Sequence, residues 1–203
     1  MDLFVDTTLY GYGIAGVKKG EVDPCFLEID VEKRGSGVGG QLQKILNDHG
    51  IVWRDVEHIY ISSGPGSFTG IKVGLSWAYG AQKGCEHKLK LAPYSGLQMV
   101  TQQSAADQLF ILPSTRSRGF AAQQGVEPKP IDCETFEATG QKISIIGQWP
   151  EFEEMHPEAI VLDRETVLSQ SLKAAIQSRA RISVESNPQA RYMRRSTAEE
   201  NLK

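Results

Sequence analysis

Residues 64–70 read Gly64-Pro65-Gly66-Ser67-Phe68-Thr69-Gly70 and stand between an apolar run and a helical pattern. The run Ile59-Tyr60-Ile61 is β-branched and aromatic, which predicts a strand. The residues after the heptad, 71–84, contain no proline and can continue as a helix. Three glycines permit positive φ angles or close approach, and Ser67 or Thr69 can cap the helix. A strand, a tight loop and a helix N-terminus in this order could bind a phosphate through backbone N–H groups.

The known catalytic motifs do not fit this loop. A P-loop requires lysine after its second glycine, whereas Ile71 follows Gly70, and the two outer glycines are one residue too far apart. A nucleophile elbow requires glycine two residues before the serine, where this chain has Pro65. The alternative is a capped strand-to-helix turn without chemistry, and the residues alone favour it.

Three segments resemble one protein family. Extended through residue 75, the loop closely resembles the signature of the TsaB family, also called YeaZ. Residues 3–8, Leu-Phe-Val-Asp-Thr-Thr, resemble the family's first strand and its Asp-Thr-Ser turn, with Thr8 in place of serine. Pro188 and residues 191–194, Arg-Tyr-Met-Arg, resemble its Pro–Tyr-Leu-Arg ending with a longer spacer. The resemblance is specific over residues 1–100 and weak over residues 101–187.

The resemblance implies an α/β chain with the two-lobed actin-like ATPase (ASKHA) fold and a reduced second lobe. Extended patterns at residues 3–5, 11–17 and 26–31 before a helix at 38–48 suit that first lobe, although periodicity alone indicates only α/β. We expect an N-terminal lobe with dimerisation helices over residues 1–105 and a smaller C-terminal lobe and tail over 106–203. In the second lobe the patterns predict strands at 109–112, 120–124, 143–146 and 159–162, a helix at 164–178, a proline-bearing loop with short extended pieces at 125–141, and a simple loop between the last two strands.

The helix predicted over residues 69–85 contains two glycine pairs, Gly70 with Gly74 and Gly80 with Gly84. Each glycine costs about 1 kcal/mol relative to alanine in a helix interior, so the pairs predict a close helix–helix approach. A buried core helix is the alternative. In the TsaB family this helix and the preceding one form the dimerisation surface. The resemblance therefore implies an interface of Val38, Leu42, Ile45, Leu46, Ile71, Gly74, Leu75, Trp77, Ala78 and Ala81.

No catalytic constellation emerges from the sequence. The four histidines are dispersed without metal-binding spacing, and actin-like relatives that transfer threonylcarbamoyl carry a histidine pair where this chain has only His49. Asp6 ends the first strand and is the best candidate for a metal–phosphate contact, although such an aspartate more often caps a turn. We therefore treat Asp6, Thr7 and Thr8 as vestigial nucleotide-site candidates, and predict no catalytic residue, no cofactor and no metal.

A second glycine-rich stretch, residues 35–40, matches the Gly-x-Gly-x-x-Gly pattern of dinucleotide-binding proteins. That pattern belongs to the first turn of a parallel βαβ unit, whereas the strand predicted before residue 35 is the third of a meander. A glycine-rich helix entry is the better interpretation. The second phosphate loop of an ATP cleft has no clear counterpart, since Gly140 and Gly147 are isolated.

The resemblance implies a non-catalytic partner subunit rather than an enzyme. Such a subunit binds a TsaD-like catalytic subunit, assembles with a TsaE-like ATPase, and helps to form N6-threonylcarbamoyladenosine in tRNA next to the anticodon. It forms a homodimer in isolation and meets tRNA indirectly through the complex. The alternatives are a stand-alone actin-like ATP-dependent transferase and a glycoprotease-like peptidase.

Charge and composition limit the partners. A formal net charge of −3 argues against binding of nucleic acid by bulk charge alone. Basic residues concentrate near the C-terminus, which predicts either a solvated tail or a tRNA contact: Arg179, Arg181, Arg191, Arg194 and Arg195. No apolar run has membrane-spanning length and no signal peptide is recognisable, and three scattered cysteines suit reduced thiols, so we expect a cytoplasmic protein with no membrane partner.

Overall fold

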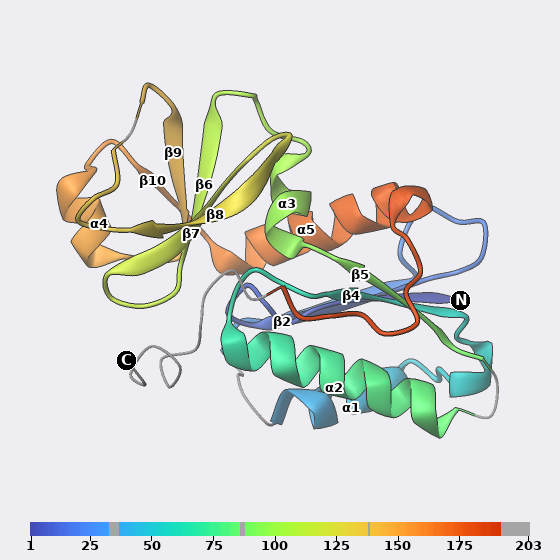
Figure 1. Cartoon of the computed structure of the whole chain (residues 1–203). Helices are drawn as coiled ribbons and strands as arrows, with labels where there is room; N and C mark the ends of the chain where they lie inside the picture. Colours follow the sequence, from blue (N-terminus) through green and yellow to red (C-terminus); the bar gives the residue numbers. More distant parts are fainter. Residues whose placement is uncertain (33–36, 86–87, 138, 192–203) are drawn as a thin grey trace.

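The computed structural model describes residues 1–32, 37–85, 88–137 and 139–191. These residues form two lobes, each built on a five-stranded mixed sheet, with helices on the faces of the sheets (Figure 1). The strand order is β3-β2-β1-β4-β5 in the first sheet and β10-β9-β6-β7-β8 in the second. The chain is therefore α/β, as the sequence predicts.

The first sheet combines a meander with two parallel strands. Its three antiparallel strands are β1 (Asp2–Asp6), β2 (Tyr12–Val17) and β3 (Phe26–Asp30). The helix α1 (Val38–Asp48) and a short 3-10 helix, η2 (Trp53–Asp55), follow. The parallel unit consists of β4 (His58–Ser62), α2 (Phe68–Gly84) and β5 (Lys90–Tyr94). The helices predicted over residues 38–48 and 69–85 are confirmed.

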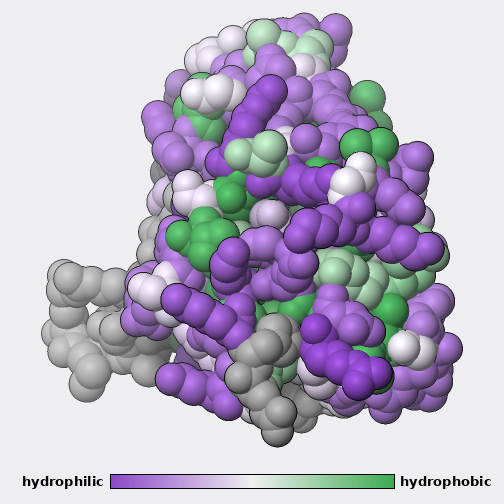
Figure 2. All heavy atoms as spheres, turned by 90° about the vertical axis from the view of Figure 1, so that its right-hand side faces the viewer, coloured by the Kyte–Doolittle hydropathy of each residue, from purple (hydrophilic) through white to green (hydrophobic). Residues whose placement is uncertain are grey.

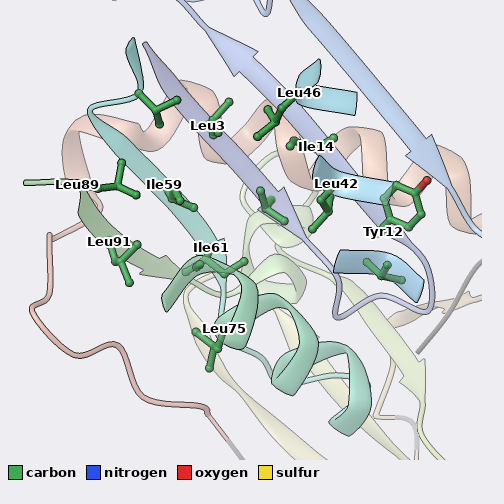
Figure 3. Close-up of a cluster of buried hydrophobic side chains, with 14 of the residues drawn as sticks. Leu3, Tyr12, Ile14, Leu42, Leu46, Ile59, Ile61, Leu75, Leu89 and Leu91 are labelled. Atoms are coloured by element: carbon green, nitrogen blue, oxygen red, sulfur yellow. The ribbon is translucent and has the colours of Figure 1, made fainter. Parts of the chain in front are cut away.

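The first lobe has three layers, because alternate residues along the strands point to opposite faces of the sheet and pack against helices on both sides. Leu3 and Val5 of β1 point to the side of α1 and α2, where they join the cluster drawn in Figure 3. Phe4 points to the opposite side and stacks on Tyr60, with ring centroids 4.4 Å apart. On that side lie α3 (Gly96–Thr101) and α5 (Arg164–Ser178). The sheet is thus covered on both faces, as expected for a sheet that includes parallel strands.

The second sheet repeats the meander-plus-parallel arrangement. Its strands are β6 (Gln108–Pro113), β7 (Arg118–Gln123), β8 (Val126–Asp132), β9 (Lys142–Ile146) and β10 (Ile160–Leu162). The first three are antiparallel, whereas β9 runs parallel to β6 and β10 runs parallel to β9. Helix α4 (Pro150–Met155) lies between β9 and β10 in the chain and buries Phe152.

Two predictions for this lobe are wrong in detail. Residues 126–132 of the proline-bearing segment form one strand, β8, rather than short extended pieces in a loop, because this strand lies at the sheet edge, where a residue without an N–H donor need not cost a ladder hydrogen bond. The connection from β9 to β10 contains α4 rather than a simple loop. Parallel neighbours need a long crossover, and here a short helix supplies it.

The chain returns to the first lobe after the second sheet. Helix α5 packs on the first sheet, and a 3-10 turn, η3 (Arg179–Arg181), leads to an antiparallel bridge between Glu185 and Leu91. The two sheets fall on either side of residue 105, but a domain division at that residue stays a prediction.

The surface is mostly polar on the face seen in Figure 2, where hydrophobic residues form small separate areas. Among the helices that the structure describes, none combines the length and the apolar character needed to cross a bilayer.

Candidate functional site

The loop at residues 64–70 connects β4 to α2 and is held in place by hydrogen bonds of its own residues. Gly64 has φ +105°, which favours glycine, and Ser67 Oγ accepts a hydrogen bond from the Gly70 N–H at 3.2 Å. Ser67, one of the two cap candidates in the sequence, therefore caps α2. The Ser67 N–H donates to the Thr8 carbonyl at 2.8 Å, which ties the loop to the turn after β1.

Gly66 and Gly70 have no room for a side chain, because the turn after β1 lies directly against them. A Cβ on Gly66 would collide with the Thr8 carbonyl, and a Cβ on Gly70 would collide with the Thr7 carbonyl. Thr7 Oγ1 donates to the Gly70 carbonyl at 2.7 Å across the same contact. The glycine spacing thus serves a close approach of α2 to the β1 turn.

Asp6 lies at the centre of a buried polar network behind the loop. Its Oδ1 accepts from the Thr8 N–H and from Thr8 Oγ1, both at 2.8 Å, and its Oδ2 accepts from Ser171 Oγ at 2.9 Å. Thr8 Oγ1 also contacts Ser62 Oγ, which accepts from the Gly96 N–H at 3.1 Å. A Cβ on Gly96 would collide with Oδ2. Both carboxylate oxygens of Asp6 are therefore engaged by the protein itself.

Burial dominates the electrostatics of this network. Asp6 is fully buried, and burial raises the pKa of its carboxyl above the ordinary value although Thr8, Ser171 and Ser62 lower it. Burial, together with the nearby Asp6, also raises the pKa of Tyr94 well above its usual range. The Tyr94 hydroxyl donates to the Val5 carbonyl at 3.2 Å. These groups tie β1, β5 and α5 together.

Loss of the Ser171 hydroxyl should weaken this tie. We expect Ser171→Ala to lower the free energy of unfolding by about 1–3 kcal/mol, because Asp6 Oδ2 then lacks its hydroxyl donor in a buried site. Ser169→Ala, in the same helix at a half-buried position, is the matched control and should change stability by less than about 0.5 kcal/mol. Urea unfolding monitored by circular dichroism measures both, and equal effects of the two changes would contradict the role of Ser171.

The space between the lobes beside the β1 turn is filled by apolar side chains. Leu9, which follows the turn, packs in one buried cluster with residues of α3, α5 and the second sheet. Members of this cluster include Leu97, Val100, Phe110, Leu112, Phe120, Ile146, Val167 and Leu168. The two lobes therefore share an apolar core that begins three residues after Asp6.

One pocket lies on the outer side of the loop. Its volume is about 380 Å³, and its lining residues are Thr7, Tyr10, Gly11, Val38, Ser67, Thr69, Gly70 and Val73. Among the residues that the structure describes, the lining side chains are uncharged and present hydroxyl groups and apolar surface. Its size suits a small molecule or one side chain of a partner protein.

Most of the residues predicted for the interface lie in the chain's own core. Val38, Leu42, Leu46, Ile71, Gly74, Leu75 and Ala78 are buried, whereas Ile45, Trp77 and Ala81 are half-buried. A Cβ on Gly74 would collide with Thr7 Oγ1, so Gly74 faces the sheet and not a second helix. The expectation that Gly74 permits close helix–helix packing is therefore wrong, because the turn after β1 occupies that side of α2.

The other glycine pair has open surroundings. A Cβ on Gly80 or Gly84 would meet nothing within 4 Å, and both residues are exposed. Trp77 lies three residues before Gly80, and its ring contacts the ring of Trp53, with centroids 5.6 Å apart. An exposed face of α2 thus combines small residues with a half-buried tryptophan.

The histidines are not brought together. His49 contacts Glu28 at 3.1 Å, His58 contacts Asp2 at 2.9 Å and His156 packs against Phe152. No three metal-ligating side chains cluster within residues 1–32, 37–85, 88–137 and 139–191. Several predicted features lie outside the described residues: His87, Gly35 and Ser36 of the glycine-rich stretch, Tyr192, Met193, Arg194 and Arg195. Of the other basic residues, Arg179 lies 3.8 Å from Asp2 and Arg181 is exposed.

Sequence reasoning missed Ser62, Gly96 and Ser171. Ser62 and Ser63 end an otherwise apolar strand, and Ser171 interrupts the apolar side of α5, which were the available signals. Neither signal identifies Asp6 as the common partner.

Comparison with known proteins agrees with the arrangement. The model of the family described as TsaD, tRNA N6-adenosine threonylcarbamoyltransferase, matches residues 38–110, and no curated protein matches the chain. Two solved structures cover nearly the whole chain. One is described as an uncharacterized protein with similarity to peptidase YeaZ from Pseudomonas aeruginosa, with 17% identity, a TM-score of 0.63, and coverage of 95% of this chain and 99% of the other. The second, YeaZ from Pseudomonas aeruginosa, has 14% identity, a TM-score of 0.62, and coverage of 94% and 98%.

These similarities confirm the predicted fold. The chain has the two-lobed α/β fold of YeaZ.

Proposed function

We propose that this TsaB/YeaZ-like chain acts in the formation of N6-threonylcarbamoyladenosine in tRNA, as a non-catalytic partner of a TsaD-like subunit. The YeaZ-like fold over nearly the whole chain and the TsaD family match over residues 38–110 support the pathway. In the complete assembly a TsaE-like ATPase joins, and tRNA is met through the complex.

The engagement of Asp6 by the chain's own hydrogen-bond donors is the observation that supports the non-catalytic role. Asp6 is the residue best placed by sequence to contact a metal–phosphate group, yet both of its oxygens accept hydrogen bonds from Thr8 and Ser171. Three residues further on, Leu9 packs in a buried apolar cluster that is shared by both lobes. A nucleotide held there would have to displace buried apolar side chains, at a cost of about 1.5–3 kcal/mol for each side chain exposed.

The same observation weighs against a stand-alone ATP-dependent transferase. A titration with ATP and Mg²⁺, followed by calorimetry, should give no saturable heat for the isolated chain. Tight stoichiometric binding that is lost on Asp6→Asn, in a variant that remains folded, would favour the transferase instead. A peptidase role gains no support from the buried serines, whose hydrogen bonds go to Thr8, Tyr94 and Asp6.

The exposed face of α2 is the surface we assign to the partner. Trp77, Gly80, Ala81 and Gly84 share one side of the helix, since they are spaced three and four residues apart. The open surroundings of both glycines permit another backbone to approach closely. The same face would serve a second copy of the chain in an isolated homodimer, which a TsaD-like subunit would replace.

A variant of this face should weaken association without harming the fold. Gly80→Arg places a long charged side chain where nothing lies within 4 Å, and arginine forms helix better than glycine does. We expect at least about a tenfold loss of affinity for both partners, with no loss of thermal stability. Lys173→Glu, an exposed change on α5, is the control. Unchanged association of Gly80→Arg in sedimentation velocity would exclude this face.

The functional test is reconstitution. A TsaD-like subunit and a TsaE-like ATPase from the same cell, supplied with tRNA and the substrates of the modification, should form N6-threonylcarbamoyladenosine only when this chain is added. Equal modification with and without the chain would contradict the proposal, and modification by the chain alone would make it an enzyme.

A further inference from the structure

The segment after η3, residues 182–191, runs back over the first lobe and ends beside the start of α2 (Figure 1). We call it the strap. Ile182 packs on the α5 side of the first sheet, and Ala190 packs on the α1–α2 side. The strap therefore passes around the β5 edge and joins the two faces of the sheet.

Three attachments hold the strap. At its start the Glu185 N–H donates to the Leu91 carbonyl at 2.8 Å, in an antiparallel bridge to β5. In the middle the Tyr79 hydroxyl of α2 reaches two acceptors, Asn187 Oδ1 at 2.8 Å and the Pro188 carbonyl. At its end the Arg191 N–H donates to the Ser63 carbonyl at 2.7 Å.

The last attachment meets the 64–70 loop directly. Ser63 is the residue before that loop, and a Cβ on Gly64 would lie only 2.9 Å from the Arg191 carbonyl oxygen. The strap thus packs against the point where β4 turns into the loop. The loop in turn is tied to the β1 turn by the Ser67 N–H bond to Thr8.

Between these attachments the strap has little burial of its own. Residues 183–187 are all exposed, and Pro188 is the buried residue of the segment. Segments with few buried apolar contacts open at a low free energy, and they open as cooperative units. A strap of this kind opens more easily than the sheets beneath it.

From these contacts we propose that the strap and the 64–70 loop open and close as one cooperative unit, which we call the clasp. The hydrogen bonds of the Tyr79 hydroxyl hold this unit closed. Opening removes the donor from the Ser63 carbonyl and the Arg191 contact from Gly64 in the same event. The β5 edge at Leu91 is uncovered at the same time. The proposal concerns the isolated chain and does not depend on the partner or on the tRNA pathway.

Hydrogen exchange of single amides in the full chain tests the clasp. In the wild type, the Arg191, Ser67 and Gly70 amides should share one opening free energy, below that of the slowest amides of β6 and β9. Tyr79→Phe removes the hydroxyl that reaches Asn187 and Pro188 and should speed exchange at all three amides by the same factor, about fivefold for one hydrogen bond. Tyr12→Phe removes a hydroxyl beside Asp30 at the opposite edge of the sheet and should leave the three rates unchanged.

Each other outcome overturns the clasp. Faster exchange at Arg191 with wild-type rates at Ser67 and Gly70 would make the strap a passive cover. Unchanged rates at all three amides in Tyr79→Phe would show that the Tyr79 hydroxyl does not hold the unit closed. Glu185→Pro, which deletes the donor to Leu91 at the other end of the strap, should reproduce the Tyr79→Phe pattern, and acceleration confined to the strap in this variant would also contradict the coupling.

Discussion

Gly70→Ala should destabilise the protein by about 3 kcal/mol or more, whereas Gly80→Ala in the same helix should stabilise it by about 0.5–1 kcal/mol. The added methyl group at Gly70 would collide with the Thr7 carbonyl, which is backbone and cannot rotate away. At Gly80 nothing lies within 4 Å, so alanine brings only its better helix propensity.

The pair separates close packing from helix propensity, because both changes add the same methyl group to α2. Urea unfolding of both variants gives the two free energies. A loss at Gly80 similar to that at Gly70 would mean that the helix meets a further surface there. Wild-type stability of Gly70→Ala would contradict the close approach of α2 to the β1 turn.

Asp6→Ala should cost about 3 kcal/mol, because it leaves the Thr8 N–H, the Thr8 hydroxyl and the Ser171 hydroxyl without their buried acceptor. Asp6→Asn keeps one acceptor oxygen and should cost less. Its more informative effect is on the pH dependence of stability, since asparagine does not titrate.

Burial raises the pKa of Asp6 in the folded state, so the folded protein binds this proton more tightly than the unfolded chain does. The contribution of Asp6 to stability is then greatest below its unfolded pKa, and it is lost as pH rises through the folded pKa. The stability of the wild type relative to Asp6→Asn should therefore fall as pH rises above about 4, the ordinary pKa of an aspartate, and level off above the folded-state pKa. Denaturant unfolding across this range measures the difference. A difference that grows with pH would show that the three donors outweigh burial and lower the pKa.

Local patterns predicted most of the fold because their signals lie within single elements. The apolar stripe of Val38, Leu42 and Leu46 predicted helix α1 with the observed bounds, and the extended pattern at residues 11–17 predicted strand β2 to within one residue. The prolines led to a loop prediction at β8, because a residue without an N–H donor is tolerated in a strand only at a sheet edge. The edge position of β8 is a tertiary property that the local sequence does not show. Helix α4 is short, and the burial of Trp149, whose Nε1 donates to the Arg116 carbonyl at 2.7 Å, is a tertiary contact with no local signal.

The candidate site was predictable in position but not in its contacts. The sequence placed Asp6 at the end of β1, which the structure confirms, and offered Ser67 and Thr69 as caps of α2, of which Ser67 is the one observed. It could not tell which side of α2 each glycine pair faces, because spacing of four gives only a common face. The bond from Ser171 to Asp6 joins residues 165 positions apart, and no periodicity reports such a contact.

Association with a TsaD-like subunit is the central claim, and size-exclusion chromatography tests it most directly. The chain, a TsaD-like subunit from the same cell and their mixture are run separately at about 50 µM, well above the dissociation constant of a stable complex. The account predicts that the wild-type and Lys173→Glu mixtures elute as one earlier peak containing both proteins, and that on serial dilution the Gly80→Arg complex separates into two peaks at a concentration at least about tenfold higher than the wild-type complex does. Two separate peaks for the wild-type mixture would contradict the account.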